Sequence, residues 1–158
     1  MELTDVTVVL DALDARAVRH WVLGGWGVAA LVGRQTREHR DLDLAVDARD
    51  LDVCLAALDD LGYHPETDWL PVRLEVAASR GRWVDVHPVV FGPDGNGLQA
   101  GLDGTTFDYP AAHLVLGAIG GRRVPCISAA WQRSAHTGYD PRPKDLHDVA
   151  LLDGLADP

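Results

Sequence analysis

Cysteine and basic side chains are both scarce in this sequence of 158 residues. Its two cysteines, Cys54 and Cys126, have no Cys-x-x-Cys spacing, which excludes a disulfide scaffold and a cysteine-based zinc site and favours a reducing compartment. Lysine and arginine number 14 against 24 aspartates and glutamates, which gives a formal net charge of −10. Nucleic-acid binding depends on a basic stripe, so this balance argues against a nucleic-acid partner and fits small or cationic partners better.

Long apolar runs are also missing. The longest weakly polar stretch, residues 22–33, is too short and too rich in glycine to span a bilayer, which needs about 20 apolar residues. Residues 1–5 lack the basic start of a secretory signal. We therefore expect no membrane partner, and a cytoplasmic enzyme or binding protein.

The sequence does contain enough apolar residues for a core, since 47% are hydrophobic and 24% charged. The length predicts one domain over residues 1–158, with a helical C-terminal segment over about 128–155. Periodicity predicts helices at 4–14, 26–31, 51–61, 128–135 and 145–155, and strands at 18–23, 41–46, 72–77 and 83–90, with a hairpin at 115–127. This order predicts a mixed β-sheet with helices packed on it, an α/β or α+β fold.

Residues 41–46 alternate acidic and apolar side chains, which is typical of a strand with one buried face. The apolar side chains can face the core, leaving Asp41 and Asp43 on the other face, about 7 Å apart along the strand. Neighbouring carboxylates repel unless a cation lies between them, and a hard divalent cation such as Mg²⁺ prefers oxygen ligands. The alternative is an edge strand with a solvated acidic face, because Asp-x-Asp is a common tripeptide.

The second acidic strand covers residues 83–90, where Asp85 and His87 share one face. If the two strands are neighbours, Asp85 adds a third carboxylate to Asp41 and Asp43, which is what a two-metal phosphoryl or nucleotidyl transfer site needs. Asp85 alone is equally compatible with an exposed strand position. His87 either orients a metal-binding carboxylate from behind or satisfies a partly buried strand.

Gly24 and Gly25 lie between a predicted strand and a predicted helix. Glycines at such a turn let the backbone approach a phosphate, and the helix N-terminus offers free N–H groups. A steric requirement of the turn explains the same glycines, so the pair gains weight only in combination with the acidic strands.

Taken together, LGGWG at 23–27, RQTREHRDLD at 34–43 and the distal Asp85 resemble the small antibiotic nucleotidyltransferases of the polymerase-β-like superfamily. HTGY at 136–139 and KDLHDV at 144–149 are similar to the C-terminal part of the lincosamide branch. The resemblance extends from about residue 20 to residue 152 and implies a nucleotidyltransferase fold. It is more specific for fold and chemistry than for the antibiotic.

The resemblance also implies roles for the acidic residues and the glycines. Asp41 and Asp43 match the metal-binding pair, and Asp85 matches the third carboxylate, which acts as general base, as metal ligand or as both. Gly24 and Gly25 match the turn that holds the nucleoside triphosphate. The spacing between Gly25 and Asp41 is longer than in the superfamily at large and similar to the antibiotic branch, and some lincosamide enzymes have Glu in place of Asp85.

The implied reaction transfers a nucleoside monophosphate, AMP from ATP, to a hydroxyl of a small antibiotic, with two Mg²⁺ ions per site. A lincosamide is the first expectation and an aminoglycoside the second. Arg37, Arg40 and the single lysine, Lys144, are candidates to hold the triphosphate, since arginine offers bidentate phosphate contacts and lysine a point charge. Each arginine is also compatible with a solvated surface position.

Three further side chains are candidates for the edge of the site. His39 either orients Asp41 or contacts phosphate, with an ordinary loop histidine as the alternative. His136 and Tyr139 lie in a loop that resembles the substrate or nucleotide edge of the family, with loop packing as the alternative.

Two other functions compete with antibiotic modification: AMPylation of a partner protein, as in toxin–antitoxin systems, and non-catalytic binding on a decayed nucleotidyltransferase fold. The presence of all three carboxylates disfavours the second of these. The sequence names neither the antibiotic nor the preferred nucleotide. A chain this short is expected to need a second subunit to enclose its substrate, so a homodimer is possible.

Overall fold

Strands and helices of this protein are described by a computed structural model for residues 1–137 and 140–155. Within these residues the α-helices are α1 Leu3–Ala15, α2 Gly24–Val32, α3 Leu51–Asp60, α4 Ala129–Ala135 and α5 Pro143–Asp153. The strands are β1 His20–Leu23, β2 Asp41–Asp47, β3 His64–Trp69, β4 Arg73–Ala78, β5 Arg82–Phe91, β6 Gly97–Ala100, β7 Thr106–Tyr109, β8 Leu114–Ile119 and β9 Arg122–Ile127. None of the described helices is long and apolar enough to cross a bilayer.

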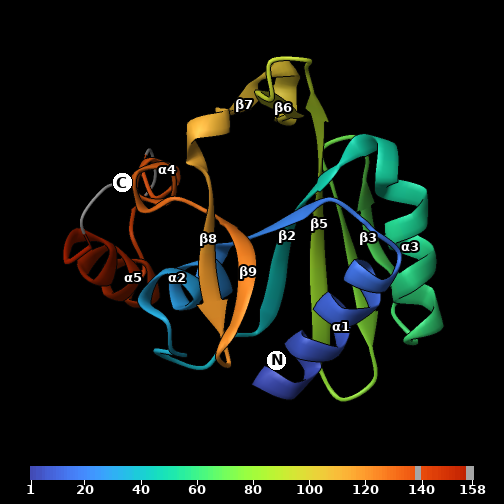
Figure 1. Cartoon of the computed structure of the whole chain (residues 1–158), viewed down its shortest axis with the longest axis horizontal. Helices are drawn as coiled ribbons and strands as arrows, with labels where there is room; N and C mark the ends of the chain where they lie inside the picture. The colour runs from blue at the N-terminus through green and yellow to red at the C-terminus, as the bar shows by residue number, and fades with distance from the viewer. Residues whose placement is uncertain (138–139, 156–158) are drawn as a thin grey trace.

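The strands form one mixed sheet in the order β3-β4-β5-β2-β1-β9-β8, and β6 joins β5 to β7 (Figure 1). Strand β2 runs parallel to β5, and β1 runs parallel to β9, while the remaining pairs are antiparallel. The predicted mixed sheet is therefore confirmed. The condition on the acidic strands is also met, because β2 and β5 are direct neighbours.

One face of the central strands carries the main hydrophobic core. The stripe of α1 formed by Val6, Val9, Leu10 and Leu13 is almost completely buried there, together with Cys54 and Leu58 of α3. These helices cover the side on which the apolar residues of β2, β4 and β5 point, such as Leu42, Leu74 and Val84. The alternating residues of the same strands then face the opposite side.

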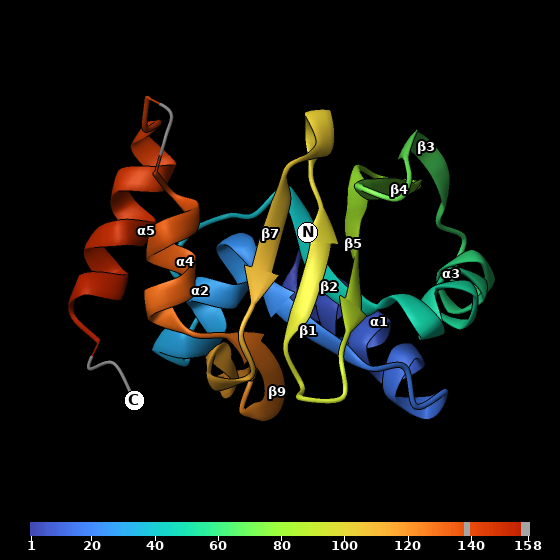
Figure 2. The same ribbon diagram turned by 90° about the horizontal axis from the view of Figure 1, so that it is seen from above.

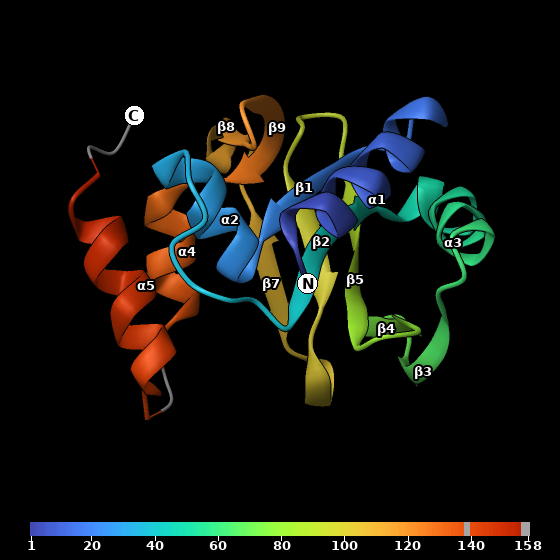
Figure 3. The ribbon, with the colours of Figure 1, turned by 90° about the horizontal axis from the view of Figure 1, so that it is seen from below.

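A second group of helices lies at the other end of the molecule. Helices α2, α4 and α5 pack together through Val28, Ala129 and Leu152 (Figures 2 and 3). The β8–β9 hairpin, with its turn at Gly120 and Gly121 as predicted, packs against α2. The loop between α2 and β2 runs from this group of helices to β2, the strand that carries Asp41 and Asp43.

The structure corrects several predicted boundaries and adds three strands. The last helix begins at Pro143, because proline is favoured in the first turn, and ends at Asp153. Helix α2 begins at Gly24, so both glycines lie in its first turn. Strands β3, β6 and β7 were not predicted from the sequence. Strand β3 is an edge strand with largely exposed polar residues, so it lacks the apolar alternation by which strands are predicted.

Candidate active site

Three carboxylates stand in a row across neighbouring strands. Asp43 on β2 lies opposite Asp85 on β5, and Asp85 lies opposite Glu75 on β4. Residues paired across strands point to the same face, so these side chains lie on the side away from the core under α1 and α3. We call Asp43, Asp85 and Glu75 the carboxylate row.

Two arginines compensate part of this negative charge. Arg73 forms an ion pair with Asp85 Oδ2, and Arg40 Nη2 lies 2.8 Å from Glu75 Oε2. Each guanidinium also lies over an indole ring: Arg73 is 4.5 Å from the centroid of Trp69, and Arg40 is 4.9 Å from that of Trp83. The ring contacts favour these orientations and leave the arginines beside the row.

The compensation is incomplete at the centre of the row. Asp85 Oδ1 is buried and forms no hydrogen bond with the residues that the structure describes, and His87 Nε2 lies 3.9 Å from Asp43 Oδ1. Ligand atoms of Asp43, Asp85 and His87 all lie within 4.8 Å of one another. An unpaired buried carboxylate oxygen beside a second carboxylate fits a divalent cation, which takes oxygen ligands.

Asp41 lies on the same face of β2 as Asp43, as predicted, but farther from Asp85 along the strand. It lies opposite Trp83, and its carboxylate is 4.0 Å from Arg40 Nε. The compact group found among the described residues consists of Asp43, Asp85 and His87, without Asp41. The predicted metal pair of Asp41 and Asp43 therefore stays a prediction.

The two glycines at the start of α2 lie close to Asp43 and to the α2–β2 loop. Gly24 has φ +60°, and a Cβ at this position would collide with the Asp43 carboxylate. A Cβ at Gly25 would collide with His39 Nδ1 and lie 2.7 Å from Arg37 Nη2. The glycine turn, Asp43, His39 and Arg37 thus meet at one place. The close approach explains why both positions need glycine.

His39 is buried against Trp26, with ring centroids 4.7 Å apart. Neither of its ring nitrogens has a hydrogen-bond partner within the described chain. Burial, and next the positive charge of Arg37, lower the pKa of His39 to about 4. The ring is therefore neutral near pH 7 and offers one donor and one acceptor at the N-terminus of α2.

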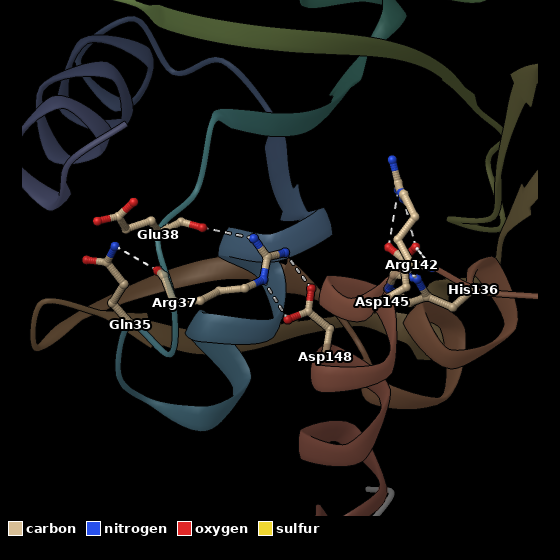
Figure 4. Close-up of polar contacts among 7 residues, drawn as sticks. All are labelled: Gln35, Arg37, Glu38, His136, Arg142, Asp145 and Asp148. Carbon is tan, nitrogen blue, oxygen red and sulfur yellow. Dashed lines mark hydrogen bonds and ion pairs between the residues drawn. The ribbon is translucent and has the colours of Figure 1, made fainter. Parts of the chain in front are cut away.

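Arg37 connects the α2–β2 loop to α5 (Figure 4). Its guanidinium makes a bidentate ion pair with buried Asp148, with Nε 3.0 Å from Oδ1 and Nη2 2.5 Å from Oδ2. Nη1 donates to the carbonyl of Glu38, and Gln35 donates to the carbonyl of Arg37 itself. The hydrogen bonds that Arg37 donates to Asp148 raise the pKa of Arg37. Arg37 therefore orders the loop, and its predicted contact with phosphate is not tested.

The other predicted site residues lie away from the carboxylate row or fall outside the residues that the structure describes. Lys144 is exposed in the first turn of α5 and forms no ion pair within residues 1–137 and 140–155. His136 Nδ1 lies 3.8 Å from Asp145 Oδ1, and Asp145 also pairs with Arg142 (Figure 4). Tyr139 falls outside the described residues.

Four residues near the site had no role predicted from the sequence: Glu75, Arg73, Gln99 and Asp148. Glu75 lies between buried Leu74 and Val76. An acidic residue between two core residues is the feature that could have indicated Glu75 as a site residue. Gln99 had no such signal, because β6 itself was not predicted. Its amide contacts His87 Nδ1 at 3.0 Å, which makes it the direct neighbour of the site.

The glycine turn at the N-terminus of α2 faces carboxylates on two parallel strands of a mixed sheet, and this arrangement is the one expected of a nucleotidyltransferase. The sequence matches the aminoglycoside-2″-adenylyltransferase family model over residues 5–152, and the chain belongs to that family. It is 34% identical to a lincosamide resistance protein from Staphylococcus haemolyticus over 147 residues, which cover 93% of this chain and 91% of that protein. A 2″-aminoglycoside nucleotidyltransferase from Escherichia coli is 45% identical over 47 residues, 28% of this chain and 27% of that protein.

Solved structures extend the comparison. The lincomycin-bound lincosamide antibiotic adenylyltransferase LnuA superposes with a TM-score of 0.87 at 33% identity, covering 97% of both chains. The aminoglycoside enzyme ANT(2″)-Ia, in complex with adenylyl-2″-tobramycin, has a TM-score of 0.72 at 22% identity, covering 95% of this chain and 86% of that one. At that identity the second likeness shows the fold alone.

Proposed function

We propose that this enzyme transfers AMP from ATP to a hydroxyl group of a lincosamide. The observation that supports this choice most is the likeness to LnuA, which covers nearly all of both chains and whose structure contains lincomycin. An aminoglycoside is the second candidate, supported by the family match and by the short stretch of higher identity to a 2″-aminoglycoside enzyme.

The proposed reaction forms a bond between the acceptor oxygen and the α-phosphorus and breaks the bond from that phosphorus to pyrophosphate. Asp85 takes the proton of the acceptor hydroxyl, and its unpaired buried Oδ1 supports this role. General base catalysis of this kind contributes about 10²–10⁴-fold. Asp43 and Asp85, with Asp41 as a further candidate, would hold Mg²⁺, which supplies positive charge against the triphosphate.

The triphosphate is proposed to lie at the N-terminus of α2. Backbone N–H groups there are free to bind anions, and Gly24 and Gly25 allow close approach. His39, with both ring nitrogens unpaired, and Arg37 beside Gly25 supply side-chain contacts to phosphate. Arg40 and Lys144 complete the proposed set of cations, with Arg40 held near the row by Glu75.

The acceptor is proposed to bind near β7 and α4. A cavity of about 540 Å³ lies there, and its lining includes Phe107, Asp108, Pro110 and Trp131. This volume is within the range of small-molecule sites, about 300–1,000 Å³. In the sequence, Tyr109 lies between the lining residues Asp108 and Pro110. Its hydroxyl bonds to Gln99, whose amide contacts His87, so this chain of contacts joins the cavity to the carboxylate row.

A screen for pyrophosphate release tests the proposal. Lincomycin and tobramycin are each incubated with the enzyme, Mg²⁺ and one of the four ribonucleoside triphosphates, and the adduct is identified by mass spectrometry. We expect an AMP–lincomycin product whose formation stops without Mg²⁺. Turnover of tobramycin alone would transfer the assignment to aminoglycosides, and AMP adducts on protein alone would reject a small acceptor.

A homodimer belongs to the same proposal. Val90 and Leu98 face each other across β5 and β6 and are 66% and 51% exposed, which supports an apolar contact surface close to the cavity. Light scattering with and without lincomycin measures the mass in solution. A monomer under both conditions would remove the second subunit from the proposal.

A further inference from the structure

A buried chain of hydrogen bonds ends on the histidine of the candidate site. The Tyr109 hydroxyl donates to Gln99 Oε1 at 2.8 Å. Gln99 Nε2 lies 3.0 Å from the Val72 carbonyl oxygen and 3.0 Å from His87 Nδ1. Tyr109 and Gln99 are 1% and 5% exposed, so solvent does not compete for these groups.

The Val72 carbonyl fixes which way the Gln99 amide points. A carbonyl oxygen can only accept, so the amide nitrogen has to face it. Turning the amide over would bring Gln99 Oε1 against the Val72 oxygen, two acceptors at 3.0 Å, in a buried place where the repulsion is costly. The Tyr109 hydroxyl adds to this orientation by donating to Oε1.

With the amide so oriented, its second hydrogen points at His87 Nδ1. That nitrogen must then accept, because a proton on Nδ1 would face the amide hydrogens. A neutral imidazole carries its one proton on the other nitrogen, which is Nε2. Nε2 is buried, has no hydrogen-bond partner within residues 1–137 and 140–155, and lies 3.9 Å from both Asp43 Oδ1 and Asp85 Oδ2.

We propose that Gln99, oriented by the Val72 carbonyl, is a positioning residue that holds His87 as the Nε2–H tautomer. His87 is then a hydrogen-bond donor aimed into the site between Asp43 and Asp85, and it is not a metal ligand. A histidine that binds a metal through Nε2 needs a lone pair there and donates its other N–H to an oxygen, which is the reverse of the arrangement here. The site consequently offers a cation oxygen ligands only. This last consequence rests on the proposed function.

The tautomer is measured first, on the metal-free wild-type enzyme. Nitrogen-15 NMR with long-range proton correlation distinguishes a protonated ring nitrogen from an unprotonated one, and His87→Gln identifies the His87 signals by their loss. We expect Nδ1 unprotonated and Nε2 protonated at pH 8. The opposite assignment, or a mixture with Nδ1–H as a major form, would overturn the proposal.

Gln99→Glu then reverses the chain. A carboxylate can only accept, and beside the Val72 carbonyl oxygen it meets a second acceptor. Its one favourable contact is then with a protonated His87 Nδ1, which leaves the Nε2 lone pair toward Asp43 and Asp85. The added charge raises affinity for every divalent cation, so the measured quantity is the ratio of Zn²⁺ to Mg²⁺ affinity by calorimetry. We expect this ratio to rise about tenfold or more, since zinc gains from a nitrogen ligand. Equal gains for both cations would mean that charge alone acts and would contradict the proposal.

Tyr109→Phe is the matched control, because it keeps the ring and leaves the Val72–Gln99–His87 contacts in place. It should leave the tautomer and the cation ratio unchanged within about twofold. If Gln99→Glu does not fold, the wild-type spectrum still decides. If the spectrum shows Nε2–H but the wild type neither binds Mg²⁺ nor releases pyrophosphate, the proposed function fails while the tautomer assignment stands.

Discussion

Two regions of this protein, helix α5 and the carboxylate row, contain aspartates with opposite degrees of pairing. On α5, both oxygens of Asp148 accept from Arg37, and both oxygens of Asp145 accept from Arg142. On the sheet, one buried oxygen of Asp85 has no partner among the described residues, and the ion pair of Asp43 with a histidine nitrogen is a long one, at 3.9 Å. A carboxylate whose two oxygens are both paired with arginine stabilises the fold. A carboxylate with an unpaired oxygen is available to bind a ligand.

The difference has a physical origin in where the arginines can reach. Arg37 comes from a loop that passes beside α5, so its planar fork meets Asp148 in a bidentate geometry. Arg73 reaches only the Oδ2 side of Asp85, and Arg40 is directed to Glu75. The negative charge at the centre of the carboxylate row is therefore only partly compensated. Such charge lowers the stability of the fold unless a bound group neutralises it.

The largest expected effect comes from Asp43→Asn. Turnover should fall by about 10⁴-fold or more, because the amide cannot replace the charge that faces the proposed cation. Stability without metal should stay equal or rise by about 0.5 kcal/mol, since like charges opposite each other on a sheet are unfavourable. Steady-state kinetics and thermal unfolding measure the two effects. Activity above a few per cent of wild type would reject the role of Asp43.

Asp85→Asn should separate chemistry from binding. As a base, Asp85 accounts for about 10²–10⁴-fold in turnover, while the affinity for Mg²⁺ and a non-hydrolysable ATP analogue changes little. Arg73 loses its partner in this variant but keeps its contact with the Trp69 ring. Calorimetric titration decides the role: affinity lost in parallel with turnover would make Asp85 a metal ligand instead of a base alone.

Asp148→Asn tests the other side of the comparison. Arg37 and Asp148 are 22% and 2% exposed at the side chain, so breaking the pair leaves a partly buried charge and should cost about 3 kcal/mol of unfolding free energy. Asp145→Asn is the matched control, and it should cost about 1 kcal/mol, because Arg142 is 63% exposed and solvated. Urea unfolding measures both. If Asp148→Asn lowered the unfolding free energy by less than Asp43→Asn, the comparison between stabilising and ligand-binding aspartates would be wrong.

The sequence predicts the sheet half of the site better than the helical half. Asp43 and Asp85 follow from period-two alternation and from strands that proved to be parallel neighbours. The choice between Asp41 and Asp43 depends on register, which alternation alone does not specify. The pairing of Arg37 with Asp148 joins positions 111 residues apart, and no local pattern encodes it.

The chain of hydrogen bonds behind His87 was the least predictable feature. Gln99 and Tyr109 come from β6 and β7, short strands of four residues each with no strong apolar alternation. Their side chains become buried only when the β6–β7 hairpin packs beside β5. A polar residue buried by tertiary contacts has no sequence signature of its own, so its role emerges from the structure.

The smallest effect concerns acid pH and a buried histidine outside both regions. Burial lowers the pKa of His20, whose Nδ1 donates to the Val18 carbonyl at 2.9 Å. Between the unfolded pKa of 6.5 and the lower folded one, the unfolded chain binds more protons, so stability falls as the pH drops below 6.5. The slope for one proton is at most about 1.4 kcal/mol per pH unit. His20→Asn should flatten the difference in unfolding free energy between pH 7 and pH 5, measured with urea. An unchanged slope in the variant would remove His20 as the source and leave the acid sensitivity to other groups, among them His39, whose pKa is lowered to about 4.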